Sequence, residues 1–258
     1  MESIAIRMLL CDVDGTLLPK GHTTISNDVF HTIRKAVEKK IDFIIASGRS
    51  YNELLTLFAP VADIVSFICC DGALAVQNNQ VIYHAPIQKD VLKAMTSAVS
   101  LCKDEALVLY GKEQTFCIGR NDQTYSFKQI DSVDEIQCDI YKIAFNNLSP
   151  FHKHATTSFA SRRGKLSGIY ADPSWTEFIA YGINKGVATE ALQSGRNISP
   201  LETAAFGDNT NDIEMLRRAR LSFSPHGATS DIIKMCKFST DNVTDEILKI
   251  IEKGESYE

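Results

Sequence analysis

Short apolar runs alternate with amphipathic segments along the first third of the chain. The runs end close to polar residues or glycines, which is typical of buried strands. Between the runs, apolar residues recur every three or four positions, which predicts helices with one buried face. Because strand and helix alternate, we expect an α/β fold with a parallel, doubly wound sheet and right-handed crossovers. The expected strands are residues 8–10, 41–46 and 64–70, and the expected helices are residues 28–40 and 51–58.

The pattern changes between residues 86 and 181, after a predicted hairpin at 77–80 with its return strand at 81–83. Strands now come in pairs separated by helices, which predicts an inserted α+β domain with an antiparallel sheet. We assign it to residues 85–182, and we interpret its basic segments, 152–154 and 162–165, as solvated loops rather than as contacts for an anionic substrate. The expected helices are residues 89–101 and 151–161, and the expected strands are residues 107–110, 115–118, 142–145, 166–170 and 177–180.

The first pattern returns after residue 183. Alternating apolar runs and amphipathic segments again predict strands and helices of a parallel sheet. We therefore expect residues 1–84 and 183–258 to form one core domain that the insertion interrupts. The expected strands of this part are residues 203–206 and 221–223, and the expected helices are residues 187–194, a helix from 213, and residues 243–252.

Composition limits the classes of partner. The chain has 258 residues, 44% of them apolar, which is enough for a sizeable core. A net charge of −5 argues against nucleic acid as a partner, since nucleic acid binding requires clustered positive charge. The N-terminal segment lacks the features of a signal peptide, and apolar runs are too short to span a membrane, so we expect a cytoplasmic protein with no membrane partner. The seven cysteines are scattered and are interpreted as reduced thiols.

Candidate chemistry begins where the first strand ends. Asp12 and Asp14 follow the apolar run directly, and Gly15 allows a sharp turn before Thr16. Ligands bind at the carboxyl ends of strands in such sheets, so both carboxylates are expected at the floor of a site. Two close carboxylates repel each other unless a cation or a shared proton intervenes, and Mg²⁺ is the cation that best suits oxygen ligands. The alternative is a simple turn, for which Asp and Gly are common residues.

Three later segments add polar residues at similar places. Ser47 and Gly48 follow the second strand, where a hydroxyl and backbone N–H groups can face an anion or simply cap a helix. Lys185 opens a helix, where a positive charge is unfavourable unless an anion lies nearby. The run Gly207-Asp-Asn-Thr-Asn-Asp212 follows a later strand, although Asp208 and Asp212 also suit helix capping.

The order of these motifs resembles the haloacid dehalogenase (HAD) superfamily. The likeness lies in Asp12-Val-Asp14-Gly-Thr, Ser47-Gly48-Arg49, Lys185 and the run from Gly207 to Asp212. It is closest to the Cof-like phosphatases of type IIB, which carry a C2 cap between the second and third motifs, and it covers nearly the whole chain. The resemblance implies a HAD-like Rossmannoid parallel sheet as the catalytic core, with an inserted α+β cap domain.

The resemblance also implies catalytic roles. Asp12 would be the nucleophile that forms an aspartyl-phosphate, and Asp14 would be the general acid and base. Mg²⁺ would be held by Asp12, Asp208 and the backbone carbonyl of Asp14, with Asp212 as a further or water-mediated partner.

The remaining matched residues would bind the phosphoryl group. Lys185 would contact its oxygens and keep the nucleophile ionised, while Ser47, Gly48 and Asn211 would donate hydrogen bonds.

The implied function is Mg²⁺-dependent hydrolysis of a small phosphorylated metabolite, a sugar phosphate by analogy with the family. The protein would act as a monomer or a homodimer. A mutase-like phosphotransferase and a non-catalytic sensor of phosphometabolites are the alternatives. The sequence departs from the family at Asp71-Gly-Ala, where relatives often have Asn-Gly-Ala, and at residues 224–228. Asp71 adds a negative charge close to the expected phosphate site.

Overall fold

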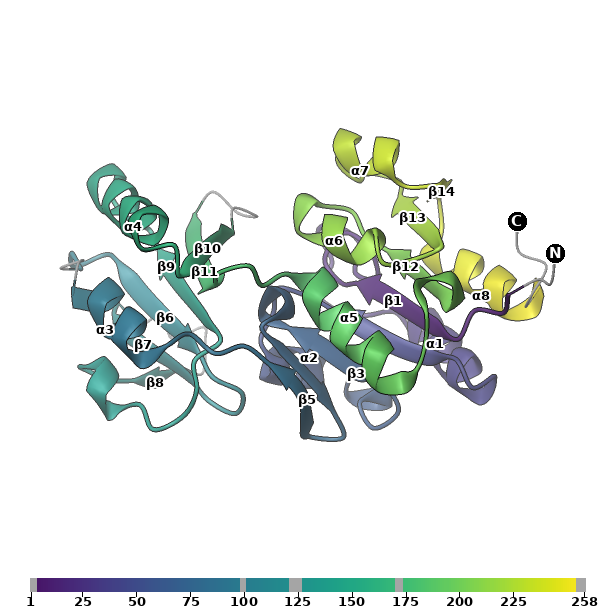
Figure 1. The fold of residues 1–258 in the computed structure, drawn as a ribbon, viewed down its shortest axis with the longest axis horizontal. Coiled ribbons are helices and arrows are strands. Elements are labelled where there is room, and N and C mark those ends of the chain that lie inside the picture. The colour runs from purple at the N-terminus through teal and green to yellow at the C-terminus, as the bar shows by residue number, and fades with distance from the viewer. Residues whose placement is uncertain (1–3, 98–100, 121–126, 170–173, 254–258) are drawn as a thin grey trace. The chain divides into compact units, whose positions relative to one another are not determined.

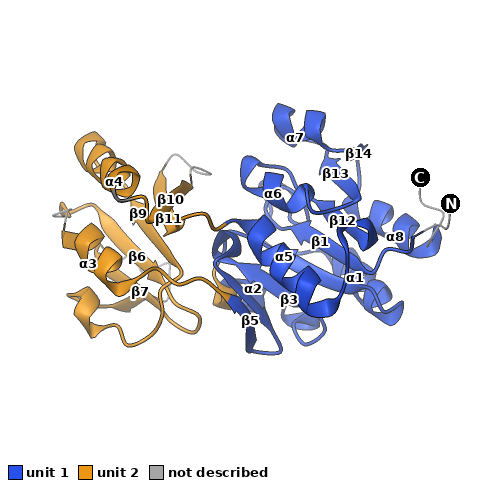
Figure 2. Cartoon of the chain, in the orientation of Figure 1, with its two compact units in different colours: residues 1–49, 53–83, 184–258 blue, residues 50–52, 84–183 orange. Residues whose placement is uncertain are grey.

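The chain folds into two compact units in a computed structural model that describes residues 4–97, 101–120, 127–169 and 174–253 (Figure 1). Residues 1–49, 53–83 and 184–258 form one of them, which we call the core unit (Figure 2). Residues 50–52 and 84–183 form the other, which we call the inserted unit. Among the helices that the structure describes, none is long and apolar enough to cross a membrane.

The core unit is built on an eight-stranded sheet in the order β14-β13-β12-β1-β2-β3-β4-β5. The six strands from β14 to β3 run parallel to their neighbours, and β4 pairs antiparallel with β3. The predicted parallel α/β core is thereby confirmed. The strands are β1 (Met8–Asp12), β2 (Asp42–Ala46), β3 (Ser66–Cys69), β4 (Leu74–Gln77), β5 (Gln80–His84), β12 (Thr203–Phe206), β13 (Leu221–Pro225) and β14 (Phe238–Thr240).

Helices cover both faces of this sheet. On one face, Ala188 and Leu192 of α5 pack with Met215 and Leu216 of α6 against apolar strand residues such as Leu10. Figure 1 shows α5 in front of the strands, and α1 contacts α8 in a second helical layer. Helix α1 ends before Lys40, which adopts a left-handed conformation. The helices are α1 (Asn27–Glu38), α2 (Tyr51–Leu57), α5 (Lys185–Arg196), α6 (Ile213–Leu216), α7 (Ser230–Met235) and α8 (Val243–Lys253).

The inserted unit has a six-stranded sheet in the order β10-β11-β9-β6-β7-β8. Its pairs are antiparallel except for the parallel pair of β7 and β8. Helices α3 (Lys89–Ser97) and α4 (Pro150–Arg163) contribute Met95 and Ala160 to a core that includes Phe145 and Phe178. The strands are β6 (Ala106–Tyr110), β7 (Thr115–Gly119), β8 (Lys128–Gln129), β9 (Lys142–Asn146), β10 (Leu166–Ile169) and β11 (Trp175–Ala180).

Several predicted elements need correction. The helix predicted over residues 151–161 is confirmed, because α4 runs from Pro150 to Arg163. Residues 152–154 and 162–163 belong to this helix, so the interpretation of the two basic segments as loops is wrong. Strands β8 and β14 and helix α7 were not predicted. Residues 98–100 and 170, included in a predicted helix and strand, lie outside the described residues. Single 3₁₀ turns complete the fold at Ala59–Val61, Cys70–Gly72, Val133–Glu135, Pro200–Glu202 and Thr210–Asp212.

Candidate active site

Three buried carboxylates meet at the carboxyl edge of the core sheet. Asp12 is the last residue of β1, and Asp208 follows β12, the parallel neighbour of β1. Asp212 lies in the 3₁₀ turn that comes next in the chain. Oxygen atoms from these three residues lie within 4.8 Å of one another. We call Asp12, Asp208 and Asp212 the acidic cluster, and it joins two motifs far apart in the sequence.

Lys185 is the cation of this cluster. It begins α5, whose first turn is capped by the side chain of Asn184. The Nζ atom is fully buried and donates to Oδ1 of Asp12 and to Oδ1 of Asp212, both at 2.6 Å. Burial lowers the pKa of Lys185, but the carboxylates of Asp12 and Asp212 raise it more, so its pKa lies well above the ordinary value. Lys185 is therefore not an exposed lysine at the start of a helix.

The charge balance of the acidic cluster favours a further cation. Burial, followed by the Asp212 carboxylate, raises the pKa of Asp12 to about 8, although Lys185 opposes this shift. Burial and Asp212 also raise the pKa of Asp208. Within the described part of the chain, the buried Oδ2 atom of Asp12 has no hydrogen-bond partner. A divalent cation at this atom would neutralise the excess of carboxylates.

The three carboxylates of the acidic cluster differ in how many hydrogen bonds they already accept. Asp212 is engaged at both oxygens, because its Oδ2 accepts the backbone N–H groups of Asp208 and Asn209 at 3.0 and 3.1 Å. Oδ2 of Asp12 has no hydrogen-bond partner among the described residues, whereas Oδ2 of Asp208 lies 3.6 Å from Nζ of the exposed Lys20, so each residue keeps one oxygen atom available for a metal ion. Gly15 makes room for Asp208, since a Cβ atom at Gly15 would lie 2.2 Å from Oδ2 of Asp208. The residues thus fit Mg²⁺, which proteins usually hold by one or two carboxylates.

Asp14 lies outside the acidic cluster and is half exposed. Its carboxylate accepts two hydrogen bonds from Arg49, from Nε at 2.9 Å and from Nη2 at 2.7 Å. A bidentate pair of this kind fixes the orientation of the carboxylate. The sequence motif contained Arg49, but no local pattern indicated that this side chain reaches Asp14.

Two further motifs meet at the same edge of the sheet. Ser47 directly follows β2, and its Oγ accepts the backbone N–H of Arg49 at 3.2 Å. The side chain of Asn211 donates from Nδ2 to Oδ1 of Asp71 at 2.9 Å. A Cβ atom at Gly48 would lie 2.9 Å from Asp71, so the glycine admits that carboxylate. The structure therefore adds Asp71, to which the sequence assigned no role, to the predicted residues.

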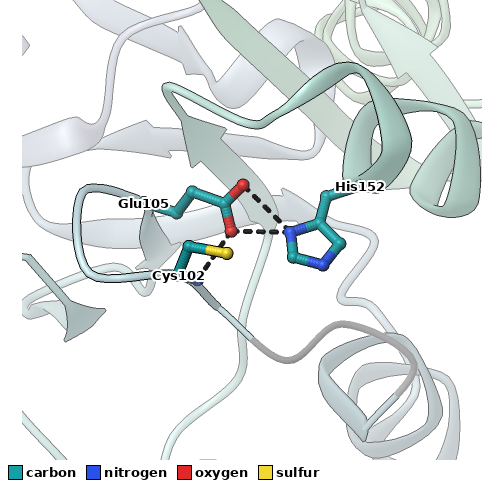
Figure 3. A group of neighbouring side chains, drawn as sticks. All are labelled: Cys102, Glu105 and His152. Atoms are coloured by element: carbon teal, nitrogen blue, oxygen red, sulfur yellow. Dashed lines mark hydrogen bonds and ion pairs between the residues drawn. The ribbon is translucent and has the colours of Figure 1, made fainter.

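A second group of possible metal ligands, Cys102, Glu105 and His152, lies in the inserted unit (Figure 3). Here the carboxylate is already satisfied, because Glu105 accepts the backbone N–H groups of Cys102 and Ser149, each at 2.8 Å. His152 Nδ1 lies 2.7 Å from Glu105 Oε2. Although burial raises the pKa of Glu105, the backbone hydrogen bonds lower it to about 2. We interpret Glu105 as the anion that holds the first turn of α4.

Comparison with known proteins extends this picture. Residues 9–250 match the family model of haloacid dehalogenase-like hydrolases. A 5-amino-6-(5-phospho-D-ribitylamino)uracil phosphatase of Escherichia coli is 22% identical over 261 residues, which cover 97% of this chain and 96% of that protein. A putative phosphatase of Buchnera aphidicola is 26% identical over 226 residues, 80% of each chain.

Solved structures share the fold. A haloacid dehalogenase-like hydrolase from Bacteroides thetaiotaomicron superposes with a TM-score of 0.83 at 17% identity, covering 95% of this chain and 99% of that chain. A sugar phosphatase of HAD subclass IIB superposes with a TM-score of 0.75 at 19% identity, covering 96% and 97% of the two chains. With the family model matching nearly the whole chain, this protein belongs to the haloacid dehalogenase-like hydrolases.

Proposed function

We propose that this hydrolase is a phosphatase of small phosphorylated metabolites, with sugar phosphates as the first class to test, and that it acts through an aspartyl-phosphate on Asp12. The contacts of Asp12 carry the proposal. Its Oδ1 is held by Lys185 at 2.6 Å, while its buried Oδ2 has no hydrogen-bond partner among the described residues. Lys185 thereby fixes the orientation of a carboxylate whose second oxygen has no hydrogen-bond partner among the described residues.

The first step is attack by a carboxylate oxygen of Asp12 on phosphorus. The new bond joins this oxygen to phosphorus as the bond from phosphorus to the ester oxygen breaks, and Asp14, protonated at one oxygen and held by Arg49 at the other, gives its proton to the leaving alkoxide. In the second step, water attacks phosphorus and gives a proton to Asp14. The bond between phosphorus and the Asp12 oxygen breaks, so that inorganic phosphate leaves and the Asp12 carboxylate is restored.

Positive charge is needed because the substrate is a dianion and the nucleophile an anion. Lys185 supplies part of this charge from within the acidic cluster. Asp12 and Asp208 would hold Mg²⁺ with support from Asp212, and the predicted contact through the backbone carbonyl of Asp14 stays a prediction. When bound, Mg²⁺ supplies positive charge against the phosphoryl oxygens. Ser47, Gly48 and Asn211 are proposed to bind the transferred group.

The substrate class rests on relatives alone. The E. coli relative is described as a phosphatase of a phosphorylated ribitylamino compound, and one structural neighbour is described as a sugar phosphatase. Both descriptions suggest a phosphate ester on a polyol or sugar. The interpretation of residues 85–182 as a substrate-selecting cap stays a prediction, as do the state of assembly and the location in the cell.

The test is release of inorganic phosphate from a panel of sugar and polyol phosphates, with Mg²⁺ and with chelator. We expect turnover that requires Mg²⁺ and that is lost in Asp12→Asn. Asp63→Asn, at an exposed acidic residue of the core unit, is the control and should match the wild type. Transfer of phosphate to a second hydroxyl without release would favour a phosphotransferase, and binding without turnover would favour a sensor.

A further inference from the structure

The turn that follows β3 has an unusual backbone. Cys70, Asp71 and Gly72 all have positive φ angles, of 49°, 55° and 101°. Residues other than glycine rarely adopt this conformation, which persists where the surrounding structure enforces it and is frequent at functional sites. Strand β3 is the parallel neighbour of β2, so the turn lies at the same edge of the sheet as Ser47.

This turn is attached to three of the predicted motifs. The backbone N–H of Asp71 donates to the carbonyl of Ser47 at 3.1 Å, and its carboxylate accepts from Asn211. A Cβ atom at Gly72 would lie 2.2 Å from the carbonyl oxygen of Asn184, directly before Lys185. The turn thus packs against the start of α5 and links segments from both halves of the core unit.

Asp71 also places a buried charge beside the phosphate-binding residues. It is only 3% exposed, and its Oδ2 would be 2.9 Å from a Cβ atom at Gly48. Burial lowers the pKa of Lys185, whereas the carboxylates of Asp12, Asp212 and Asp71 raise it. An uncharged asparagine at position 71 could accept the same hydrogen bond, so the negative charge calls for a separate explanation.

We propose that Asp71 is a positioning residue of the phosphate site, one that orients the Asn211 amide and whose charge weakens the binding of inorganic phosphate. The inference rests on the proposed function. One N–H of the Asn211 amide is committed to Asp71, which fixes the direction of the second N–H. The charge opposes the dianionic product, and weak product binding favours turnover where release limits the rate.

Two substitutions separate the hydrogen bond from the charge. Asp71→Asn keeps an acceptor oxygen for Asn211, removes the charge, and tolerates the left-handed backbone. Asp71→Gly removes both the acceptor and the charge, and glycine suits the φ of 55°. Asp63→Asn serves as the charge-matched control on the surface, and thermal unfolding checks that each variant is folded.

The measurements are kcat and KM with p-nitrophenyl phosphate and the Kd of inorganic phosphate by calorimetry, all with Mg²⁺. We expect Asp71→Asn to bind phosphate about tenfold more tightly, by the loss of one nearby like charge, and to have a lower kcat where product release limits the rate. Asp71→Gly and Asn211→Ala should each lower kcat about tenfold. The double variant that combines Asp71→Gly with Asn211→Ala should be no slower than Asn211→Ala alone.

An unchanged phosphate Kd in Asp71→Asn would overturn the role of the charge. Losses in kcat that multiply in the double variant would overturn the action through Asn211. If the wild type hydrolyses no phosphate ester, the proposed function fails, and the phosphate Kd of Asp71→Asn alone then decides whether the charge weakens phosphate binding. If Asp71→Gly does not fold, the Asp71→Asn variant still gives that answer through the same calorimetric measurement.

Discussion

Replacing the nucleophile should abolish catalysis and make the protein increasingly stable, relative to the wild type, as the pH rises. Burial, then Asp212, raises the pKa of Asp12 from 3.8 to about 8, against the effect of Lys185. In the unfolded chain this carboxyl ionises near its ordinary pKa, whereas the folded protein retains the proton up to about pH 8. The unfolded state therefore binds fewer protons between these values. Each rise of one pH unit in this window lowers the free energy of unfolding by about 1.4 kcal/mol.

Asp12→Asn has no proton to lose at this position and lacks this pH dependence. Between pH 5 and pH 7, ionisation of Asp12 should lower the free energy of unfolding of the wild type by about 2–3 kcal/mol. The free energy of unfolding of the variant minus that of the wild type should therefore grow by about this amount over the range. Any change in the hydrogen bond from Lys185 shifts the difference by an offset that is the same at each pH in this range, so the slope is unchanged.

The assay is urea unfolding in chelator at pH 5, 6 and 7, with Asp63→Asn as the control for an exposed carboxyl. The control should show no growing difference. Adding Mg²⁺ at pH 7 should stabilise the wild type more than Asp12→Asn, because the cation has lost a charged ligand. A difference between Asp12→Asn and the wild type that stays constant from pH 5 to pH 7 would refute the reasoning.

Three further results are expected. Gly15→Ala should weaken Mg²⁺ binding in thermal-shift titrations, because its Cβ would lie 2.2 Å from a carboxylate of the acidic cluster; Gly21→Ala, with a similar φ but open surroundings, should not. Arg49→Gln should slow hydrolysis of alkyl phosphates more than of p-nitrophenyl phosphate, because a poor leaving group depends more on a well-oriented Asp14; equal losses would contradict this. Glu105→Gln should lower the free energy of unfolding by about 1–3 kcal/mol at pH 7. The pKa of Glu105 is lowered to about 2 in the folded protein, so the stabilisation by its carboxylate is lost as the pH falls toward 2. Urea unfolding should therefore show the difference between Glu105→Gln and the wild type shrinking over this range.

Local patterns predicted the strands that carry the site, because each apolar run ends at its functional residue. Asp12 could be placed at the end of β1 from the sequence alone, since the run of Met8 to Leu10 stops there. Short elements such as β8 and β14 have two or three residues, too few to show a periodic pattern.

Contacts between distant side chains could not be predicted in the same way. The family resemblance implied that Lys185 faces Asp12, although 173 positions separate them. No local pattern indicated that Arg49 pairs with Asp14 or that Asp71 binds Asn211. These contacts depend on the register of neighbouring strands and on the turns after them, and a single sequence records neither.

The position of β1 in the sheet has a consequence for the synthesis of the chain. One neighbour, β2, follows within the first fifty residues, but the other, β12, begins only at Thr203. Until the ribosome has made that segment, one edge of β1 presents unpaired backbone groups beside an apolar surface, a known route to aggregation. Fragments that end within the insertion should therefore aggregate. Chaperones should bind the nascent chain most strongly before its last quarter emerges from the ribosome.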